Sequence, residues 1–379
     1  MHPTGLALPA TSEASTPAGT TGGRLVSLDV FRGATIASMI LVNDPGSAES
    51  YPQLEHAAWH GWTFTDLVFP FFLWIVGVAM TLSFSSRTAR GENRSALLRH
   101  VLKRSAIIFA IGLFLNGFPY FRLATIRIPG VLQRIAICYL IAAAIFLYTR
   151  VRGQMIWTVG LLAAYWAAMT LIPVPGYGPG VLEPVGNFAQ WVDSHILSGH
   201  MWRATKVWDP EGLVSTVPAV ATVLFGILAG QLLRARNLSP AEKTSWMLAW
   251  GNVMLLAGNV MGVFLPINKG LWTSSYSVFM AGMALIVFAI CYWIVDVQEW
   301  RRWTRPFVIF GMNAIAMFVL SGLLARILGL AGWKQPIYQW LFAPLASPRN
   351  ASLLYAVCFV LVCYAAAWLL YRKKWFVKF

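Results

Sequence analysis

The sequence predicts an all-α integral membrane protein, a bundle of about ten transmembrane helices with both termini in the cytoplasm. Of its 379 residues, 58% are hydrophobic and only 11% are charged, a balance that is not typical of water-soluble domains of this length. Apolar stretches close to the ~20 residues that a helix needs to cross a bilayer recur along the whole chain. A transmembrane β-barrel would instead show short segments with alternating apolar and polar residues.

The spans can be assigned in order from these apolar stretches. The first 23 residues, rich in Thr, Ala, Gly and Pro, are expected to form a disordered cytoplasmic tail. Residues 24–379 are then expected to form one transmembrane domain. We expect its spans at about 28–46, 66–86, 101–118, 131–149, 156–172, 214–233, 244–264, 273–295, 306–328 and 352–371.

The distribution of basic residues predicts the orientation of these spans. Lys and Arg accumulate in cytoplasmic loops, and most of the 29 basic residues fall on the inner side if both termini are cytoplasmic. The net charge of +15 therefore indicates topology and attraction to anionic lipid, and it does not favour nucleic-acid binding.

Polar residues gather first at the two ends of the first span. Asp29 and Arg32 stand three residues apart, a spacing that allows an ion pair within the helix. Asn43 and Asp44 lie at the other end, before a Pro-Gly turn. An end-cap pair followed by a turn explains them as well as a functional site does.

The stretch EHAAWHGWTFTDLVFPFF, residues 55–72, leads into the second span. His56 and His60 would share a helix face if this loop were helical, which resembles half of a metal site. Gly61 follows at once and no further His is near, so we predict no metal. The remaining alternatives are an interfacial aromatic loop or a neutral imidazole acting as general base, with Asp66 fixing its tautomer.

Three arginines, Arg122, Arg127 and Arg134, collect on the expected outer side, against the orientation rule. Their position suggests a role with an anion such as phosphate. Pairing with an acid is the structural alternative, and the candidate partners are Asp66, Glu183 and Asp209.

Further polar groups occupy the later loops and spans. The segments WDPEGLVSTVPA (208–219) and PINKGLWTSSY (266–276) carry polar and aromatic residues at the junctions between loops and helices, among them Lys269, Trp272 and Ser274. Asn313 lies within an otherwise apolar span, where an amide serves as interhelical glue or as a ligand contact. Walker, GxSxG and HExxH motifs are absent from the sequence, which disfavours ATP-driven transport and the common hydrolase mechanisms.

Seven segments together resemble one known family. They are SLDVFRG, MILVNDPGS, EHAAWHGWTFTDLVFPFFLWIVG, IPGVLQRIAICY, WDPEGLVSTVPA, NKGLWTSSY and GMNAIAMF, and in this order they are similar to the heparan-α-glucosaminide N-acetyltransferase family and its bacterial inner-membrane relatives of the NagX type. The resemblance implies transfer of an acetyl group from cytosolic acetyl-CoA to the amine of an amino sugar on the periplasmic side. It also implies a multi-pass protein of the bacterial inner membrane and a homodimer.

The resemblance also implies roles for single residues. His56 matches the family's catalytic histidine and Asn43 the asparagine that supports it, while Asp66 is our candidate for orienting His56. His60 falls where animal members carry an asparagine, so it receives no catalytic role. The candidates for binding acetyl-CoA are Arg32, Arg134, Gln133, Asn313, Trp272 and Ser274.

Several alternatives stay open at this point. Animal members carry a large luminal N-terminal domain before the first segment, and only a short tail stands there in this chain, which favours a glucosamine-type or cell-wall-derived acceptor. The L-D-x-x-R-G start is shared loosely with membrane O-acyltransferases. His56 acts either as a general base or as a nucleophile that is itself acetylated. A secondary transporter of sugars or amino sugars is the alternative from another class, although no repeat relates the two halves of the sequence.

Overall fold

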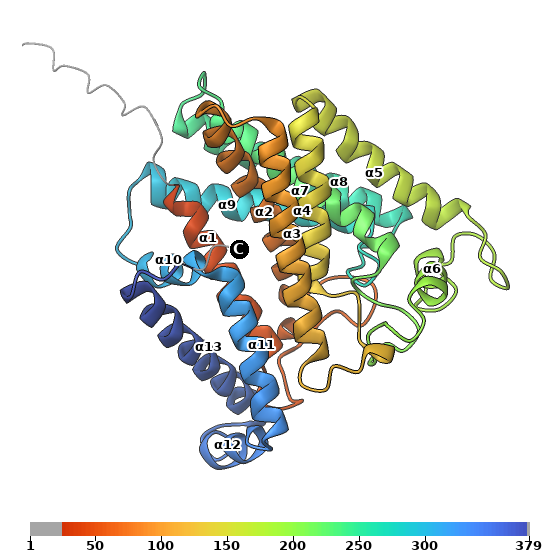
Figure 1. The fold of residues 1–379 in the computed structure, drawn as a ribbon, viewed down its shortest axis with the longest axis vertical. Helices are drawn as coiled ribbons and strands as arrows, with labels where there is room; N and C mark the ends of the chain where they lie inside the picture. Colours follow the sequence, from red (N-terminus) through yellow and green to blue (C-terminus); the bar gives the residue numbers. More distant parts are fainter. Residues whose placement is uncertain (1–24, 377–379) are drawn as a thin grey trace, which may run out of the picture.

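The computed structural model describes residues 25–376, and within them the chain consists of helices and loops without a β-sheet (Figure 1). The predicted all-α fold is therefore confirmed. The predicted tail, residues 1–23, lies outside the described residues. The helices of the first half of the chain are α1 (Val26–Asn43), α2 (Phe64–Ala89), α3 (Arg94–Gly117), α4 (Val131–Tyr148), α5 (Val151–Leu171) and the short α6 (Phe188–Ile196), with single 3-10 turns at η1 (Pro52–Leu54) and η2 (Leu123–Thr125).

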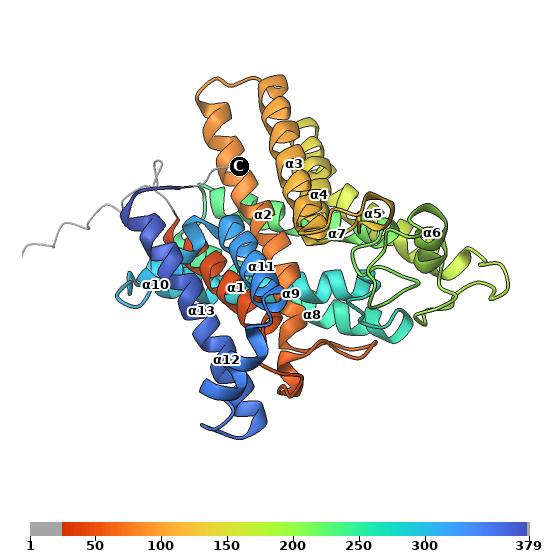
Figure 2. The ribbon, with the colours of Figure 1, turned by 60° about the horizontal axis from the view of Figure 1, so that its bottom comes forward.

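The second half adds α7 (Leu213–Arg234), α8 (Pro240–Phe264), α9 (Ser274–Tyr292) with its π-helical end η3 (Trp293–Val297), α10 (Arg305–Met312), α11 (Ala314–Leu330), α12 (Lys334–Leu341) and α13 (Pro348–Arg372). Two groups of helices are visible in both ribbon views. The helix α4 packs against both α2 and α3, and α1 packs with α10, α11 and α13 (Figures 1 and 2).

Eight of the described helices are long and apolar enough to cross a membrane, or nine if the pair formed by α10 and α11 counts as one span. This agrees with the prediction of about ten spans, with two differences. The predicted span 101–118 is part of α3, whose first half carries several basic residues that lower its hydropathy. The prediction of one continuous helix at 306–328 is wrong, because the chain bends by 82° between α10 and α11 at Asn313.

Close helix contacts depend on glycines that face a neighbouring backbone. A Cβ atom on Gly77 in α2 would stand 2.1 Å from the carbonyl oxygen of Val223 in α7, and one on Gly226 in α7 would stand 2.0 Å from that of Trp74. A Cβ on Gly33 in α1 would likewise meet the Phe307 carbonyl oxygen in α10 at 1.8 Å. Small residues let membrane helices approach closely, so these contacts fix how α2 lies against α7 and α1 against α10.

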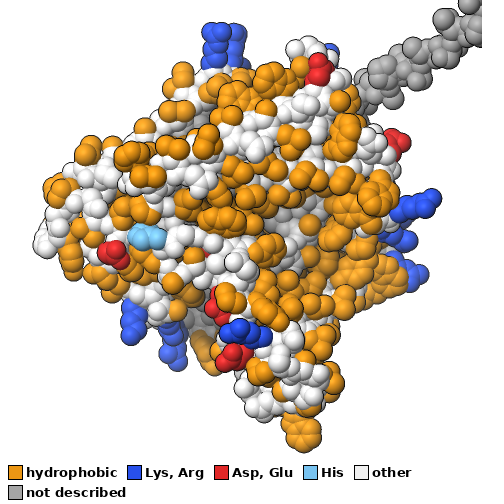
Figure 3. Space-filling view, turned by 180° about the vertical axis from the view of Figure 1, so that it is seen from behind, with side chains coloured by type: hydrophobic (Ala, Val, Ile, Leu, Met, Phe, Trp, Pro, Cys, Tyr) orange, Lys and Arg blue, Asp and Glu red, His pale blue; other side chains and the backbone are white. Residues whose placement is uncertain are grey.

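The outer surface is largely apolar, as a lipid-facing surface requires. Only 17% of the most apolar window of α8 is buried, and only 28% of that of α5. The space-filling view shows hydrophobic side chains over much of one face, with Lys and Arg mainly near its edges (Figure 3). The fold is therefore that of a multi-pass membrane protein, with its polar residues held between helices or in loops.

Candidate active site

His56 and Asp66 are joined by a hydrogen bond where the loop after α1 meets the start of α2. Nδ1 of His56 lies 2.7 Å from Oδ1 of Asp66. The Asp66 carboxylate is fully buried, whereas about half of the His56 side chain is exposed. Because a carboxylate only accepts hydrogen bonds at neutral pH, Nδ1 carries the proton and Nε2 is left as the basic nitrogen.

The sequence around Asp66 fixes this carboxylate in place. Its second oxygen, Oδ2, accepts hydrogen bonds from the backbone N–H groups of Ala57 (3.1 Å) and Thr63 (3.0 Å). Thr63 and Asp66 form a capping box at the start of α2, which satisfies N–H groups that a helix otherwise leaves without partners. The hydroxyl of Tyr276 in α9 donates to the Asp66 carbonyl oxygen at 2.6 Å. One acidic side chain thus begins the helix, anchors the loop and orients His56.

Lys269 is the third member of this cluster, and it comes from the loop between α8 and α9. Its Nζ lies 3.0 Å from Nδ1 and 3.1 Å from Nε2 of His56, and 3.7 Å from Oδ1 of Asp66. Burial lowers the pKa of Lys269 below its usual range, although the nearby Asp66 carboxylate acts in the opposite direction. The sequence placed Lys269 in a polar loop without assigning it a role.

His60 and the tryptophans of the same stretch have structural partners. The loop around His56 is not helical, so the two histidines do not share a helix face. Nδ1 of His60 lies 3.2 Å from Nδ2 of Asn268. Trp59 donates through Nε1 to the Leu182 carbonyl oxygen at 2.9 Å, and its ring packs on that of Trp208. These contacts fit the interfacial loop that the sequence offered as one alternative.

Asn43 is the last residue of α1, and its side chain is exposed. Within the described range, no hydrogen bond joins Asn43 to His56, Asp66 or Lys269. The structure therefore brings together two of the three predicted catalytic residues and adds Lys269 to them.

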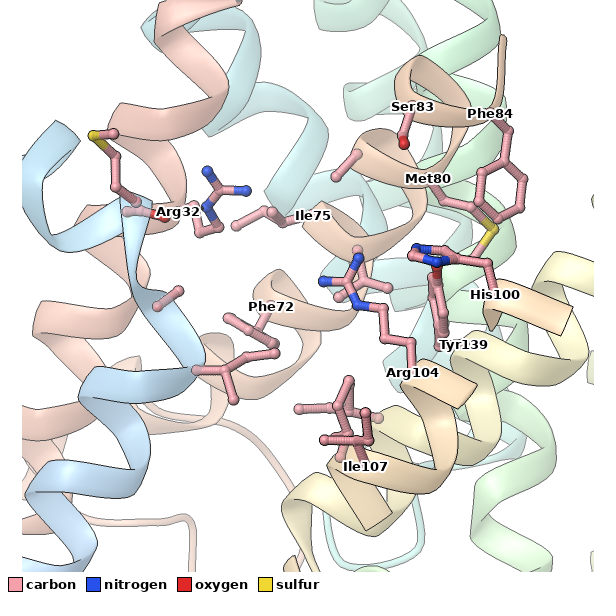
Figure 4. Close-up of a pocket in the computed structure, with 18 of the residues that line it drawn as sticks. Arg32, Phe72, Ile75, Met80, Ser83, Phe84, His100, Arg104, Ile107 and Tyr139 are labelled. Atoms are coloured by element: carbon pink, nitrogen blue, oxygen red, sulfur yellow. Dashed lines mark hydrogen bonds between the residues drawn. The ribbon is translucent and has the colours of Figure 1, made fainter. Parts of the chain in front are cut away.

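A cavity of about 690 Å³ opens between α1, α2, α3, α4 and the bend between α10 and α11 (Figure 4). Arg32 from α1 and Arg104 from α3 reach toward each other across it. His100 and Lys103, which are exposed, also line it, and the rest of the wall is mostly apolar, with residues such as Phe72 and Ile75. We call this space the basic cavity, because it combines cationic side chains with an apolar interior.

Arg32 is held in its position by α1 and α10. It forms the predicted ion pair with Asp29, and its Nε donates to the Gly311 carbonyl oxygen at 2.7 Å. Arg104 lies over the Tyr139 ring, 5.3 Å from its centroid, and its buried Nε has no hydrogen-bond partner among the described residues. The basic residues of α3 served only to predict orientation in the sequence, since nothing local showed that they face a cavity.

The other predicted acetyl-CoA ligands do not line the basic cavity. Trp272 and Ser274 are buried and donate to Thr222 Oγ1 (3.2 Å) and to the Leu162 carbonyl oxygen (2.8 Å), respectively. Gln133 is buried where α3 meets α4, against Gly112. Asn313 lies at the bend between α10 and α11 and donates to the Trp375 carbonyl oxygen at 3.2 Å.

Arg134 and Arg127 have different surroundings. Arg134 is 1% exposed, lies 5.0 Å from the centroid of the Trp272 ring and donates to Ser215 Oγ at 2.5 Å. Its Nε and Nη1 atoms have no hydrogen-bond partner in the part of the chain that is described. Arg127 instead pairs with Asp209 at 2.6 Å and Glu211 at 2.5 Å. Pairing with an acid, the structural alternative, therefore holds for Arg127.

An aromatic layer separates the basic cavity from the His56 cluster. Asp66 and Phe72 are six residues apart in α2, which is roughly 9 Å along the helix axis. Between them, the buried Phe69 ring packs on Trp272 at 5.1 Å between centroids, and Trp272 packs on Tyr276 at 5.2 Å. The basic cavity and the histidine therefore lie at different levels of the bundle, with packed rings between them.

Comparison with known proteins adds to this geometry. A family model described as "Heparan-alpha-glucosaminide N-acetyltransferase, catalytic" matches residues 24–262. The heparan-alpha-glucosaminide N-acetyltransferases of Mus musculus and Homo sapiens are 28% and 29% identical to this chain over 413 aligned positions, which cover 94% of the chain and 60% of each relative. The chain thus spans about 60% of the length of these relatives. His56, Asp66 and the cationic residues of the basic cavity all lie inside the matched segment. The chain belongs to the heparan-α-glucosaminide N-acetyltransferase catalytic family.

Proposed function

We propose that this protein is a membrane-embedded N-acetyltransferase that moves an acetyl group from acetyl-CoA to the amine of an amino sugar. The observation that carries the proposal is the hydrogen bond from His56 Nδ1 to the buried Asp66 carboxylate, which leaves Nε2 as the ring nitrogen that can take a proton. Family membership supports the same chemistry.

In the proposed reaction the acceptor amine attacks the thioester carbonyl of the donor. A C–N bond forms, the C–S bond breaks, and the proton lost by the nitrogen passes to Nε2 of His56 and then to the leaving thiolate. Asp66 stabilises the imidazolium that forms in between. The Lys269 ammonium, 3.1 Å from Nε2, stands where it would stabilise negative charge on the thioester oxygen or the departing sulfur. Asn43 stays our proposal for orienting the acyl carbonyl.

The basic cavity is our proposal for the donor site. Arg32, Lys103 and Arg104 would meet phosphate groups of acetyl-CoA, because guanidinium and ammonium groups bind phosphate well. The apolar wall would surround the uncharged arm that carries the thioester. To reach His56, the thioester has to pass the layer formed by Phe69 and Trp272, and Arg134, whose N–H groups lie beside this layer, is the donor contact that we propose there.

Purified protein supplied with acetyl-CoA and glucosamine tests the function directly. We expect release of free CoA that requires the acceptor and is lost in His56→Ala. The double variant Lys103→Gln and Arg104→Gln should raise the KM for acetyl-CoA with little change in kcat. Arg150→Gln combined with Arg152→Gln removes two exposed cations elsewhere and is the matched control. Uptake of sugar into vesicles without release of thiol would identify a transporter instead.

Two further measurements distinguish an acetyl-histidine intermediate from direct transfer, and a nitrogen acceptor from an oxygen acceptor. A radiolabelled acetyl group trapped on the enzyme without acceptor, and lost in His56→Ala, would support an acetyl-histidine intermediate; sequential kinetics without a trapped species supports direct transfer. A product that withstands hydroxylamine is an amide, whereas an O-acetyl ester is cleaved.

We further propose a glucosamine-type or cell-wall-derived acceptor on the periplasmic side of a bacterial inner membrane, cytosolic acetyl-CoA as the donor, and a homodimer. For the dimer, α8 offers a surface: Asn252 and Asn259 lie seven residues apart on its exposed face, and amides on a lipid-facing helix favour association. The variant with Leu at both positions should be monomeric in detergent by light scattering. An unchanged mass would remove α8 from the proposed interface.

A further inference from the structure

A second cavity, of about 710 Å³, lies at the opposite ends of the helices that line the basic cavity. In α3, His100 and Arg104 line the first cavity, and Asn116 near the end of the helix lines the second. In α11, Ala314 lines the first and Arg326 the second. Since both helices run from one space to the other, the two cavities are separated along the helix axes and are distinct sites.

The charge of this second cavity is strongly positive. Arg122, Arg127, Arg203 and Arg326 line it, and no Asp or Glu is among its lining residues in the described part of the chain. Arg127 pairs with two carboxylates, Asp209 and Glu211, so it contributes no net positive charge. The other three form no ion pair with any described residue. We call this space the arginine cavity.

Each of these three arginines has donors left for a ligand. The buried Nη1 of Arg326 has no hydrogen-bond partner among the described residues. Arg203 makes one long hydrogen bond, of 3.3 Å, to Thr125 Oγ1, and Arg122 lies over the Tyr120 ring at 5.6 Å. A guanidinium carries five N–H donors, and a buried donor without a partner is unfavourable. An anion in the cavity would accept hydrogen bonds from these unused donors, including the buried Nη1 of Arg326.

The rim of the arginine cavity is apolar and exposed. The side chains of Tyr120 and Leu330, which line it, are 70% and 51% exposed, and Leu123 in the adjoining turn is 75% exposed. In a multi-pass protein, aromatic and aliphatic side chains beside cations at the end of a span are typical of the boundary between headgroups and hydrocarbon. A soluble anion would gain nothing from this rim, whereas a lipid would contact it with its acyl chains.

We propose that the arginine cavity binds the phosphate of an anionic membrane lipid, with the acyl chains lying against Tyr120, Leu123 and Leu330. Basic pockets between membrane helices bind such headgroups, and the planar guanidinium matches the geometry of phosphate. The site is independent of the acetyl-transfer chemistry, because none of its arginines belongs to the His56 cluster or to the basic cavity.

The test uses the full chain in a neutral detergent, with phosphatidylglycerol titrated against phosphatidylcholine and bound lipid counted by native mass spectrometry. The variant Arg122→Gln with Arg203→Gln removes two exposed cations, so its fold should persist. Since each of the two cations near an anionic headgroup contributes a factor of about five, affinity for phosphatidylglycerol should fall about 25-fold. Higher salt should weaken binding to the wild type.

Arg150→Gln with Arg152→Gln is the matched control, because it removes the same charge from another exposed site, and it should bind as the wild type does. Equal phosphatidylglycerol binding by the wild type and the Arg122/Arg203 variant would overturn the proposal. A separate arm uses inorganic phosphate and thermal unfolding. If phosphate alone protects the wild type as well as the lipid does, and the variant loses this protection, the anion site stands and the lipid as its occupant is rejected.

Discussion

At the scale of single residues, the His56 ring contacts the buried carboxylate of Asp66 and the partly buried ammonium of Lys269. Asp66 approaches it at Nδ1, and Lys269 lies close to both ring nitrogens. Lys269 Nζ also lies 3.7 Å from Asp66 Oδ1, so the carboxylate and the ammonium act on the same imidazole and on each other. The rate should therefore depend on both neighbours.

The first prediction concerns Asp66. Asp66→Asn removes the charge that stabilises the imidazolium and replaces one of two accepting oxygens with an NH2 group, which cannot accept the hydrogen bonds that Asp66 receives. Turnover should fall by about 10²-fold or more, and thermal unfolding should still show a folded protein. Glu49→Gln, in the same loop and exposed, is the control that should leave turnover unchanged. Turnover measured with acetyl-CoA and glucosamine checks the result, and an Asp66→Asn protein with full activity would remove Asp66 from the mechanism.

The second prediction concerns the pH dependence of Lys269. Burial lowers the pKa of Lys269, so its ammonium loses its proton at a lower pH than an ordinary lysine, and activity should decline on the alkaline side below the usual range of ~10.4. Lys269→Arg keeps the charge at all accessible pH values. Its alkaline decline in kcat/KM should move to higher pH or vanish. If the profile of the variant matches that of the wild type, another group causes the decline.

The Asp66 to His56 contact could be predicted from the sequence, whereas the Lys269 contact could not. His56 and Asp66 stand ten residues apart in one segment, and the capping pattern of Thr63 and Asp66 marks where the helix begins. Lys269 reaches the same ring from a loop more than two hundred residues later, and only the packing of α9 against α2 brings it there. Local patterns carry no information about such a contact.

At the scale of helices, glycines determine how closely neighbouring helices pack, and a bend decides whether an apolar stretch forms one helix or two. Where Gly77 faces Val223, α2 and α7 touch through their backbones. The bend at Asn313 divides a stretch whose composition is that of one span. Each half is apolar, and a single Asn is also found inside continuous membrane helices. Hydropathy therefore predicts where the helices lie in the sequence, but it does not predict the bend between α10 and α11.

The third prediction compares two glycines in membrane helices. Gly77→Ala places a Cβ 2.1 Å from the Val223 carbonyl oxygen, and such overpacking should destabilise the protein by about 1–3 kcal/mol. A Cβ on Gly160 in α5 meets no atom within 4 Å, so Gly160→Ala should cost nothing. Thermal unfolding in the same detergent measures both. Equal midpoints for the two variants would contradict the close approach of α2 and α7.

At the scale of the whole molecule, the two ends of α2 contribute residues to two different candidate sites. The His56 cluster lies at its start, and the basic cavity is lined by its later residues up to Phe84. Trp272 and Ser274, which the sequence offered as donor contacts, are buried and do not line the basic cavity, and their role toward the donor stays a prediction. The cationic group on α3 was visible in the sequence, but its cavity forms only when six helices assemble.

The fourth prediction is that the two ends of α2 lie on opposite sides of the membrane. Ala48→Cys, before α2, and Ser86→Cys, near its end, both introduce thiols at exposed positions. In sealed vesicles of one orientation, a membrane-impermeant maleimide should label only one of them, and vesicles of the opposite orientation should show the reverse. The wild type, whose four cysteines are buried or partly buried, is the blank. Equal labelling of both positions from one side would contradict the span.

The packed rings of Phe69, Trp272 and Tyr276 have a consequence for the permeability of the membrane to protons and ions. If the protein carries acyl groups between two compartments, as we propose, a leak of protons and ions through it would discharge the membrane potential. The buried rings pack against one another between the basic cavity and His56, so we expect the resting protein not to conduct protons or ions. Liposomes that contain it are expected to hold an imposed pH gradient as long as empty liposomes do.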